Sequence, residues 1–296
     1  MRTLLVALAA GLVACAPVRG PKPPEGEISL SVEGKVKGGP LYLTRAQAER
    51  LPRRSFRARE PVSGREVRFE GVSLADLLQG EARPEKRADV AVVRTRGGTA
   101  VAIPLVRILE LKPVLADRAD GKPVADWARE ATLSGEAWLL AWPNLDQPGL
   151  DFDPRARWWW AAGVSKVVLE SWLATYGKAL RVPAGAPDEA RRGAEEAELH
   201  CMPCHPLRGA GGERGPDLAG VLNGRAPAAF AAAVRPHALA RGLPSGPEGE
   251  AALDRIASFL RSLQASNPAS ADEPGEPEEP TEPPPGRPSA AMPPRR

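Results

Sequence analysis

Apolar and polar residues alternate in the first part of the chain. Ile28, Leu30 and Val32 are separated by polar neighbours, and this spacing predicts a strand because successive side chains of a strand point to opposite faces. Further strand-like runs lie at residues 90–93, 100–103, 138–141 and 164–169, and short helical stretches lie around residues 44–51 and 73–78. This mixture predicts a domain of strands and short helices over residues 27–180.

The pattern becomes helical after residue 187. Small apolar residues recur at helical spacing over residues 188–200, with Asp188 placed to cap the helix. An alanine-rich helix is predicted over residues 226–234. Ser245 and Glu248 form a capping pattern for a last helix, whose apolar side carries Ala252, Ile256, Phe259, Leu260 and Leu263. With RVPAGAP at 181–187 as a linker, the chain is predicted to be α+β: a mixed α/β domain followed by a small all-α domain.

The charges exclude one class of partner. The 296 residues carry 40 Lys and Arg and 37 Asp and Glu, and the two signs are mixed along the chain. A protein that binds nucleic acid needs a concentrated basic face, so we expect no nucleic-acid partner.

The N-terminus has the pattern of an export signal. Arg2 precedes an apolar stretch over residues 4–14, which is shorter than the roughly 20 residues needed to span a bilayer. The stretch ends in LVAC at residues 12–15, which resembles the bacterial lipoprotein cleavage box. That resemblance implies a signal peptide over residues 1–14 and lipidation of Cys15; a plain secretory signal is the alternative.

A lipid on Cys15 would place the protein on the periplasmic side of a bacterial membrane. The residue after it is Ala16 rather than an acid, which favours the outer membrane. Residues 15–26 are proline-rich and predict an extended spacer. Residues 266–296 are rich in proline and glutamate, without aromatic residues, and predict a disordered tail.

The motif with the clearest chemistry is CMPCH at residues 201–205, the attachment sequence of a c-type haem. Cys201 and Cys204 are spaced to bond the two vinyl groups of one porphyrin, and His205 follows as the proximal iron ligand. Zinc would need four ligands, and no second CxxC is present. A thioredoxin-like pair would need a βαβ context, whereas the flanking segments are helical. We therefore expect one haem c.

Residues 188–265 resemble a small class I cytochrome c domain. The resemblance rests on the helix before the motif, on GPDL at residues 215–218 and on the final amphipathic helix. It implies that Pro216 packs beside the proximal histidine. The family places a methionine, the sixth iron ligand, before a proline ahead of the last helix.

This chain departs from the family at that methionine. The corresponding pair is Leu243-Pro244, and leucine cannot bind iron. Met202 lies in the proximal loop and Met292 in the tail, so His237 is the nearest remaining donor. His237 is a possible distal iron ligand; an open sixth position, with His237 as an ordinary surface residue, is the alternative.

Residues 27–180 resemble, more loosely, the molybdopterin-binding fold of the sulfite-oxidase superfamily. The resemblance rests on the segments at residues 30–36, 69–78, 142–143, 158–160 and 164–169. Active members bind molybdenum through a cysteine about a dozen residues before the glycine equivalent to Gly71, where this chain has Arg59 and Glu60. The domain is therefore predicted to have lost molybdopterin or to bind something else; molybdopterin held through other ligands is the alternative.

Eight arginines lie between Arg45 and Arg68 with acidic residues among them. They could form an anion pocket, but a solvated face of salt bridges is the favoured interpretation.

Together these features predict a membrane-anchored cytochrome that transfers single electrons outside the cytoplasm, with the N-terminal domain docking a periplasmic redox partner. Two alternatives stay open. In the first, the N-terminal domain oxidises a small substrate and passes electrons to the haem. In the second, an open iron serves a sensor or a peroxidase. An electron carrier is favoured over a stand-alone enzyme.

Overall fold

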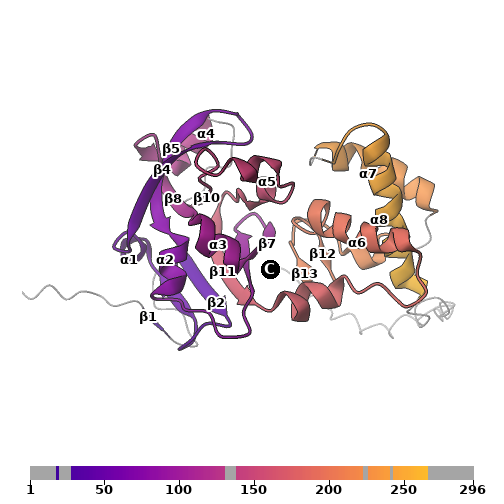
Figure 1. The fold of residues 1–296 in the computed structure, drawn as a ribbon, viewed down its shortest axis with the longest axis horizontal. Helices are drawn as coiled ribbons and strands as arrows, with labels where there is room; N and C mark the ends of the chain where they lie inside the picture. The colour runs from indigo at the N-terminus through magenta and orange to yellow at the C-terminus, as the bar shows by residue number, and fades with distance from the viewer. Residues whose placement is uncertain (1–17, 20–27, 131–137, 223–225, 241–242, 266–296) are drawn as a thin grey trace, which may run out of the picture.

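A computed structural model describes residues 18–19, 28–130, 138–222, 226–240 and 243–265. The predicted signal peptide, Cys15 and the predicted disordered tail lie outside these residues. The described chain forms two lobes, one built on sheets and one mostly helical (Figure 1). The α+β class is confirmed.

A six-stranded sheet contains most of the predicted strands. Its order is β1 (Val18–Arg19), β3 (Leu41–Leu43), β2 (Leu30–Gly34), β11 (Val164–Glu170), β6 (Val90–Thr95) and β7 (Ala100–Pro104). The central strand β11 runs parallel to β2 and antiparallel to β6. Two residues of the predicted spacer thus pair with the sheet as β1. The last strand, β7, faces the helical lobe (Figure 1).

A second sheet contains the predicted strand at residues 138–141 and further strands that the sequence analysis did not predict. Its order is β10 (Leu139–Ala141), β8 (Val114–Ala119), β5 (Glu66–Ser73) and β4 (Arg53–Arg59), with β9 (Lys122–Pro123) beside β8. The arginine-rich run forms β4 and part of β5, where charged side chains alternate with buried Ala58, Val67 and Phe69. Several of the arginines lie in salt bridges, which confirms the predicted salt-bridged face.

Short helices cover the two sheets: α1 (Arg45–Ala48), α2 (Leu74–Gln79), α3 (Leu105–Leu111), α4 (Val124–Glu130), α5 (Ala156–Trp159) and the single turns η1 (Pro148–Phe152) and η2 (Leu173–Gly177). Thr44 and Gln47 form a reciprocal capping box at α1, and the Ser73 hydroxyl caps α2. Buried tryptophans fill the space between the layers, among them Trp127, Trp138 and Trp142.

The helical lobe contains α6 (Asp188–His200), η3 (Leu218–Gly220), α7 (Pro227–Ala240) and α8 (Pro247–Ala265), with the hairpin strands β12 (Pro206–Leu207) and β13 (Ala210–Gly211). Helices α6 and α8 cross closely at Gly193, where an added Cβ would lie 1.9 Å from the carbonyl oxygen of Arg255. The predicted helices are present. Both cap assignments were wrong: Pro187 precedes α6, so Asp188 is its first residue, and α8 begins at Pro247, two residues after Ser245.

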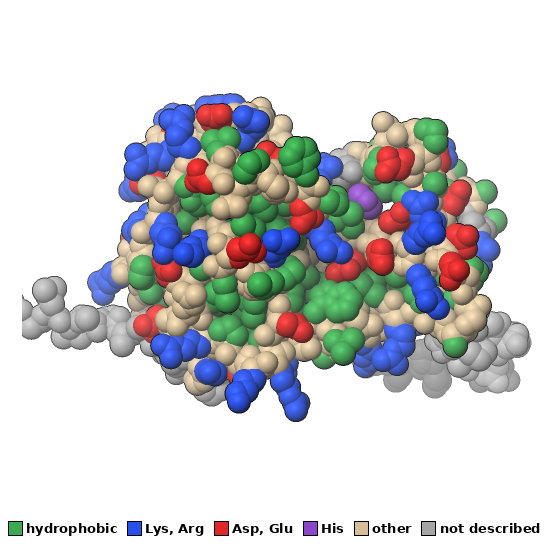
Figure 2. Space-filling model, viewed as in Figure 1, with side chains coloured by type: hydrophobic (Ala, Val, Ile, Leu, Met, Phe, Trp, Pro, Cys, Tyr) green, Lys and Arg blue, Asp and Glu red, His purple; other side chains and the backbone are tan. Residues whose placement is uncertain are grey.

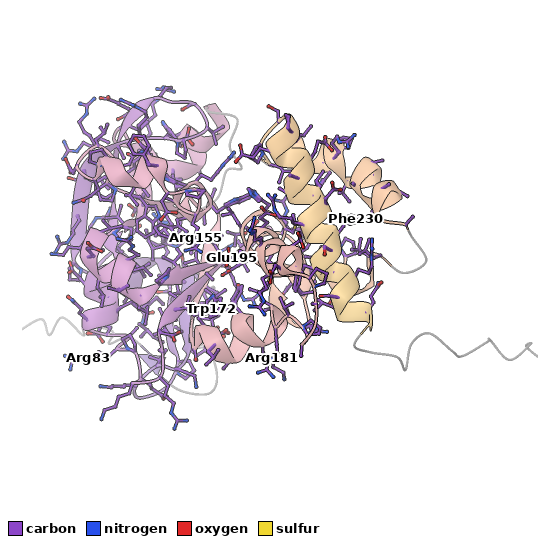
Figure 3. The ribbon with its side chains drawn as sticks, turned by 45° about the vertical axis from the view of Figure 1, so that its right-hand side comes forward. Arg83, Arg155, Trp172, Arg181, Glu195 and Phe230 are labelled. Atoms are coloured by element: carbon purple, nitrogen blue, oxygen red, sulfur yellow. The ribbon has the colours of Figure 1, made fainter. Side chains whose placement is uncertain are left out.

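The two lobes share apolar contacts. One continuous cluster of buried residues joins Val90, Val92 and Ala100 of the sheet to Tyr176 and to Met202 of the motif. Figure 3 shows Arg155 and Trp172 at this junction. On the face drawn in Figure 2, basic and acidic side chains are intermixed rather than gathered into one field. Among the residues described, no helix is long and apolar enough to cross a membrane.

Candidate functional site

The CMPCH motif lies in a tight turn at the end of α6. Cys201 is the residue that ends the helix, and its backbone N–H donates to the carbonyl oxygen of Ala197 at 3.0 Å. The N–H groups of Cys204 and His205 both donate back to the carbonyl oxygen of Cys201, at 3.1 and 2.9 Å. The turn therefore brings both cysteines and His205 to the same end of the helix. The two thiols are free and half-buried.

The surroundings of Cys201 favour the protonated form of its thiol. Burial, with smaller effects of Cys204 and Glu196, raises the pKa of Cys201 to about 12. A redox-active CxxC pair works through a thiolate of lowered pKa, and burial acts in the opposite direction at Cys201.

The segment that follows the motif contacts the His205 ring and fixes its orientation. Its Nδ1 lies 2.9 Å from the carbonyl oxygen of Pro216. A carbonyl oxygen only accepts hydrogen bonds, so this contact places the proton on Nδ1 and leaves the lone pair on Nε2. The ring lies so close to Gly215 that a Cβ there would be 2.1 Å from its Cε1 atom. His205 is thus oriented to offer Nε2 to a metal.

His237 faces His205 from α7. The two ring centroids are 5.9 Å apart and the ring planes are nearly perpendicular, at 87°. His237 is otherwise exposed. His200, the third histidine, lies at the end of α6, where burial and the charge of Arg157 lower its pKa. The structure therefore brings His237, and not His200, to the predicted iron ligand.

Leu243 occupies a different environment. Its side chain is buried in a small apolar cluster between α7 and α8, with Ala231, Ala252 and Leu253. Met202 is also buried, and it lines the junction between the lobes. Neither position offers a donor opposite His205.

The residues around the motif suit a covalently held haem. Two free thiols, an imidazole oriented through Nδ1 and apolar side chains that include Leu207, Leu218, Phe230 and Phe259 lie in one lobe. Across the described residues, no three histidine, cysteine, aspartate or glutamate side chains converge on a point that could hold a bare metal ion. The donor set fits a group that supplies its own equatorial nitrogens.

The sheet lobe contacts the motif directly. The N–H of Ala100 on β7 donates to the carbonyl oxygen of Pro203 at 3.0 Å, and the N–H of Glu213 donates to the carbonyl oxygen of Gly98 at 2.7 Å. Arg94 pairs with the Glu213 carboxylate at 3.0 Å. The sequence analysis did not find these contacts, because they join segments about a hundred residues apart.

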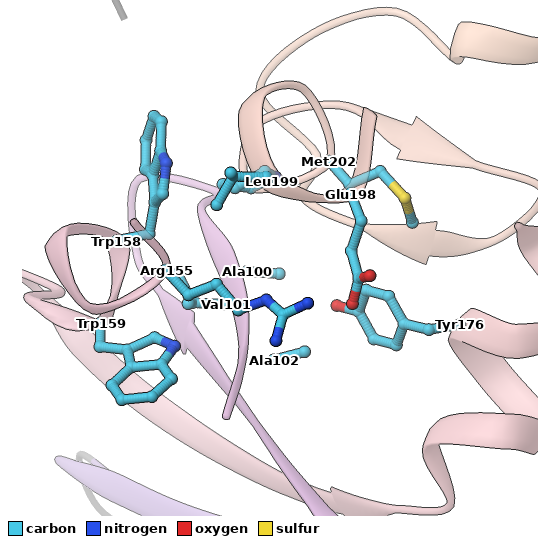
Figure 4. Close-up of a pocket in the computed structure, with 11 residues that line it drawn as sticks. Ala100, Val101, Ala102, Arg155, Trp158, Trp159, Tyr176, Glu198, Leu199 and Met202 are labelled. Atoms are coloured by element: carbon cyan, nitrogen blue, oxygen red, sulfur yellow. The ribbon is translucent and has the colours of Figure 1, made fainter. Parts of the chain in front are cut away.

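A cavity of about 40 Å³ lies at the junction of the lobes, next to Met202 and Pro203 of the motif. Figure 4 shows the guanidinium of Arg155 pointing towards Glu198 and Tyr176. Glu198 accepts a hydrogen bond from the indole N–H of Trp172 at 3.0 Å, and burial raises the pKa of Tyr176. A volume of this size holds about two or three water molecules.

Arg59 and Glu60, which stand where the resemblance would place the molybdenum cysteine, form local hydrogen bonds. Glu60 is 3% exposed, and its carboxylate accepts the backbone N–H groups of Val62 and Ser63 at 2.8 and 2.6 Å. The backbone of Arg59 pairs in both directions with the side-chain amide of Asn144. Neither residue supplies a thiolate or a free carboxylate, so these residues do not fit molybdopterin as the sulfite-oxidase family binds it.

Comparisons with known proteins find only distant similarity to this chain. No family model matches the chain, and no curated protein matches it. Among solved structures, the sulfane dehydrogenase SoxCD from Paracoccus pantotrophus is similar at 16% identity with a TM-score of 0.35. That match covers 48% of this chain and 38% of the other.

Proposed function

We propose that this protein is a c-type cytochrome that transfers single electrons through one covalently attached haem. Thioether bonds from Cys201 and Cys204 would hold the haem, and His205 would bind its iron from the proximal side. The haem supplies one-electron exchange between ferric and ferrous iron.

The observation that carries this proposal is the orientation of His205. Its Nδ1–H donates to the carbonyl oxygen of Pro216 and its ring is packed against Gly215. A hydrogen bond of this kind fixes the tautomer of a metal-binding histidine and raises its basicity. An ordinary surface histidine needs neither feature. The class I cytochrome c resemblance of residues 188–265 is consistent with the same role.

We assign the sheet lobe a docking and supporting role. Its strand β7 bonds to the motif at Pro203, and the Arg94–Glu213 pair ties the following loop to β6. These contacts hold the motif loop in position from the sheet lobe. Its remaining surface is available to a redox partner.

The cellular setting completes the proposal. We assign the protein to the periplasmic side of a bacterial membrane, where a lipid on Cys15 would anchor it. Of the two membranes, the outer one is favoured. Haem is attached to such motifs outside the cytoplasm, so the export signal and CMPCH support each other. The partner would be a periplasmic redox protein.

The test is haem content. The full chain should be matured in a periplasm, denatured in alkaline pyridine and measured by absorption after reduction, together with molybdenum analysis. We expect one haem per chain that survives acid extraction, and no molybdenum. Cys201→Ala/Cys204→Ala should lose the covalent haem, whereas Ser262→Ala, a substitution on α8, should keep it. Wild-type protein without covalent haem would overturn the proposal.

A further inference from the structure

The sixth iron position is the part of the site that the sequence leaves open. This inference deepens the proposed function and rests on it, because it concerns the face of the iron opposite His205. That face decides between an electron carrier and a protein that binds small ligands, since only an open or weakly held position admits them.

Leu243 is fixed away from a ligand role. Its N–H donates to the carbonyl oxygen of Ala238 at 3.0 Å, which closes the end of α7, and its side chain is 5% exposed in the apolar cluster between α7 and α8. The next residue is equally constrained, because an added Cβ at Gly249 would lie 1.8 Å from the carbonyl oxygen of Pro244. The turn that carries the ligand in the resembling family therefore serves packing here.

Helix α7 presents a nitrogen donor in its place. His237 lies six residues before Leu243, with its ring centroid 5.9 Å from that of His205. Two imidazoles bound on opposite sides of one metal, at about 2 Å each, have centroids roughly 6 Å apart. The observed separation of 5.9 Å is close to that value, although a direct edge-to-face contact of two rings has a similar separation.

The pair does not suit a bare ion. Two imidazoles alone leave a tetrahedral zinc short of two ligands, and no third histidine, cysteine or carboxylate converges on them in the described part of the chain. A porphyrin supplies four nitrogens around the iron, so two axial imidazoles complete a set of six.

Helix α7 is tied to the rest of the lobe close to His237. The guanidinium of Arg235 pairs with the carboxylate of Glu250 on α8, although both side chains are partly exposed. Val234 and Ala238 pack against the cluster around Leu243. These contacts lie on both sides of His237 along the helix and set its position.

We propose that His237 is the distal iron ligand, so that the haem is six-coordinate with His205 and His237. A bis-histidine haem has a lower potential than a histidine–methionine haem, because thioether ligation raises the potential. It also leaves no open position for carbon monoxide or peroxide. The site is then built for electron transfer rather than for sensing or peroxidase chemistry.

The experiment compares ferric proteins matured in a periplasm, each first shown to carry one covalent haem. Wild-type protein should give the low-spin signature of two nitrogen ligands by electron paramagnetic resonance and near-infrared magnetic circular dichroism. His237→Ala should become high-spin, should bind stoichiometric carbon monoxide when reduced, and should return to low-spin on addition of free imidazole. Leu239→Ala, an exposed change on the same helix, should match wild type.

A second variant keeps the test decisive if His237→Ala folds poorly. His237→Met should replace the signature of two nitrogens by that of one nitrogen and one thioether, with a higher potential. An unchanged ferric spectrum in either variant, at full haem content, would overturn ligation by His237. Wild-type protein without covalent haem would instead remove the proposed function, so the two failures are distinguishable.

Discussion

Gly215→Ala tests the support beneath His205. Gly215 has no positive φ, so alanine is permitted by the backbone and only the space is at issue. The new Cβ would lie 2.1 Å from Cε1 and 2.3 Å from Nδ1 of His205. Ordinary carbon contacts begin near 3.5 Å, so the ring or the segment around residue 215 has to move by roughly 1.4 Å.

That movement has two separable costs. Overpacking of a tightly packed position destabilises a protein by about 1–3 kcal/mol. A shift of this size also breaks the 2.9 Å hydrogen bond from Nδ1 to Pro216, with a net value of about 1 kcal/mol. Because this bond raises the basicity of the ligand and so favours ferric iron, its loss should raise the potential of the haem by up to about 40 mV.

Both costs can be measured against a matched control. Gly149→Ala is the same change at a position where an added Cβ meets nothing within 4 Å. Equilibrium denaturation and potentiometric titration of the haem-loaded proteins should show a less stable, more oxidising Gly215→Ala beside an unchanged Gly149→Ala. A Gly215→Ala protein with the stability and potential of its control would refute the proposed support of His205.

Two further changes test the packing of the lobes. Gly193→Ala should destabilise the helical lobe by about 1–3 kcal/mol in chemical denaturation, because its Cβ would lie 1.9 Å from a backbone oxygen of Arg255 on α8; helix circular dichroism with an unchanged midpoint would contradict this. Asp76→Asn removes a carboxylate whose pKa is lowered chiefly by a hydrogen bond from Arg54. Its loss should cost about 0.5–1 kcal/mol at pH 7, and the difference from wild type should vanish as the pH falls through the folded-state pKa, below about 4; a difference that persists in acid would count against this ion pair.

The sequence predicted four strands of the first sheet, β2, β6, β7 and β11, because apolar residues dominate them, but it did not predict the short strands β1 and β3. Strands β6 and β11 are apolar over most of their length, and both have neighbouring strands on each side in that sheet. Strands β4 and β5 were not predicted, because arginine and glutamate occupy their exposed positions. With so many charged residues, the alternation of their buried residues was not recognised. Strand β5 pairs with β4 as its neighbour along the chain, but its pairing with β8 joins residues more than forty positions apart.

The two sides of the candidate site also differ in how far they could be predicted from the sequence. The proximal side is local: residues 201–205 and 215–216 lie within sixteen positions of one another, so the spacing of thiols, imidazole, glycine and proline could be read directly. The distal side is not local. His237 is thirty-two residues from His205, and only the crossing of α6, α7 and α8 brings their rings to 5.9 Å.

Leu243 shows how the two sides are connected. In the resembling family the residue before this proline binds iron, and here it fills the apolar cluster between α7 and α8. Leu243 also closes the end of α7 through its bond to Ala238. Because α7 carries His237, the packing of Leu243 helps to fix the helix from which His237 reaches His205. The residue at the position of the expected methionine and the proposed distal ligand are therefore linked through one apolar cluster and one helix end.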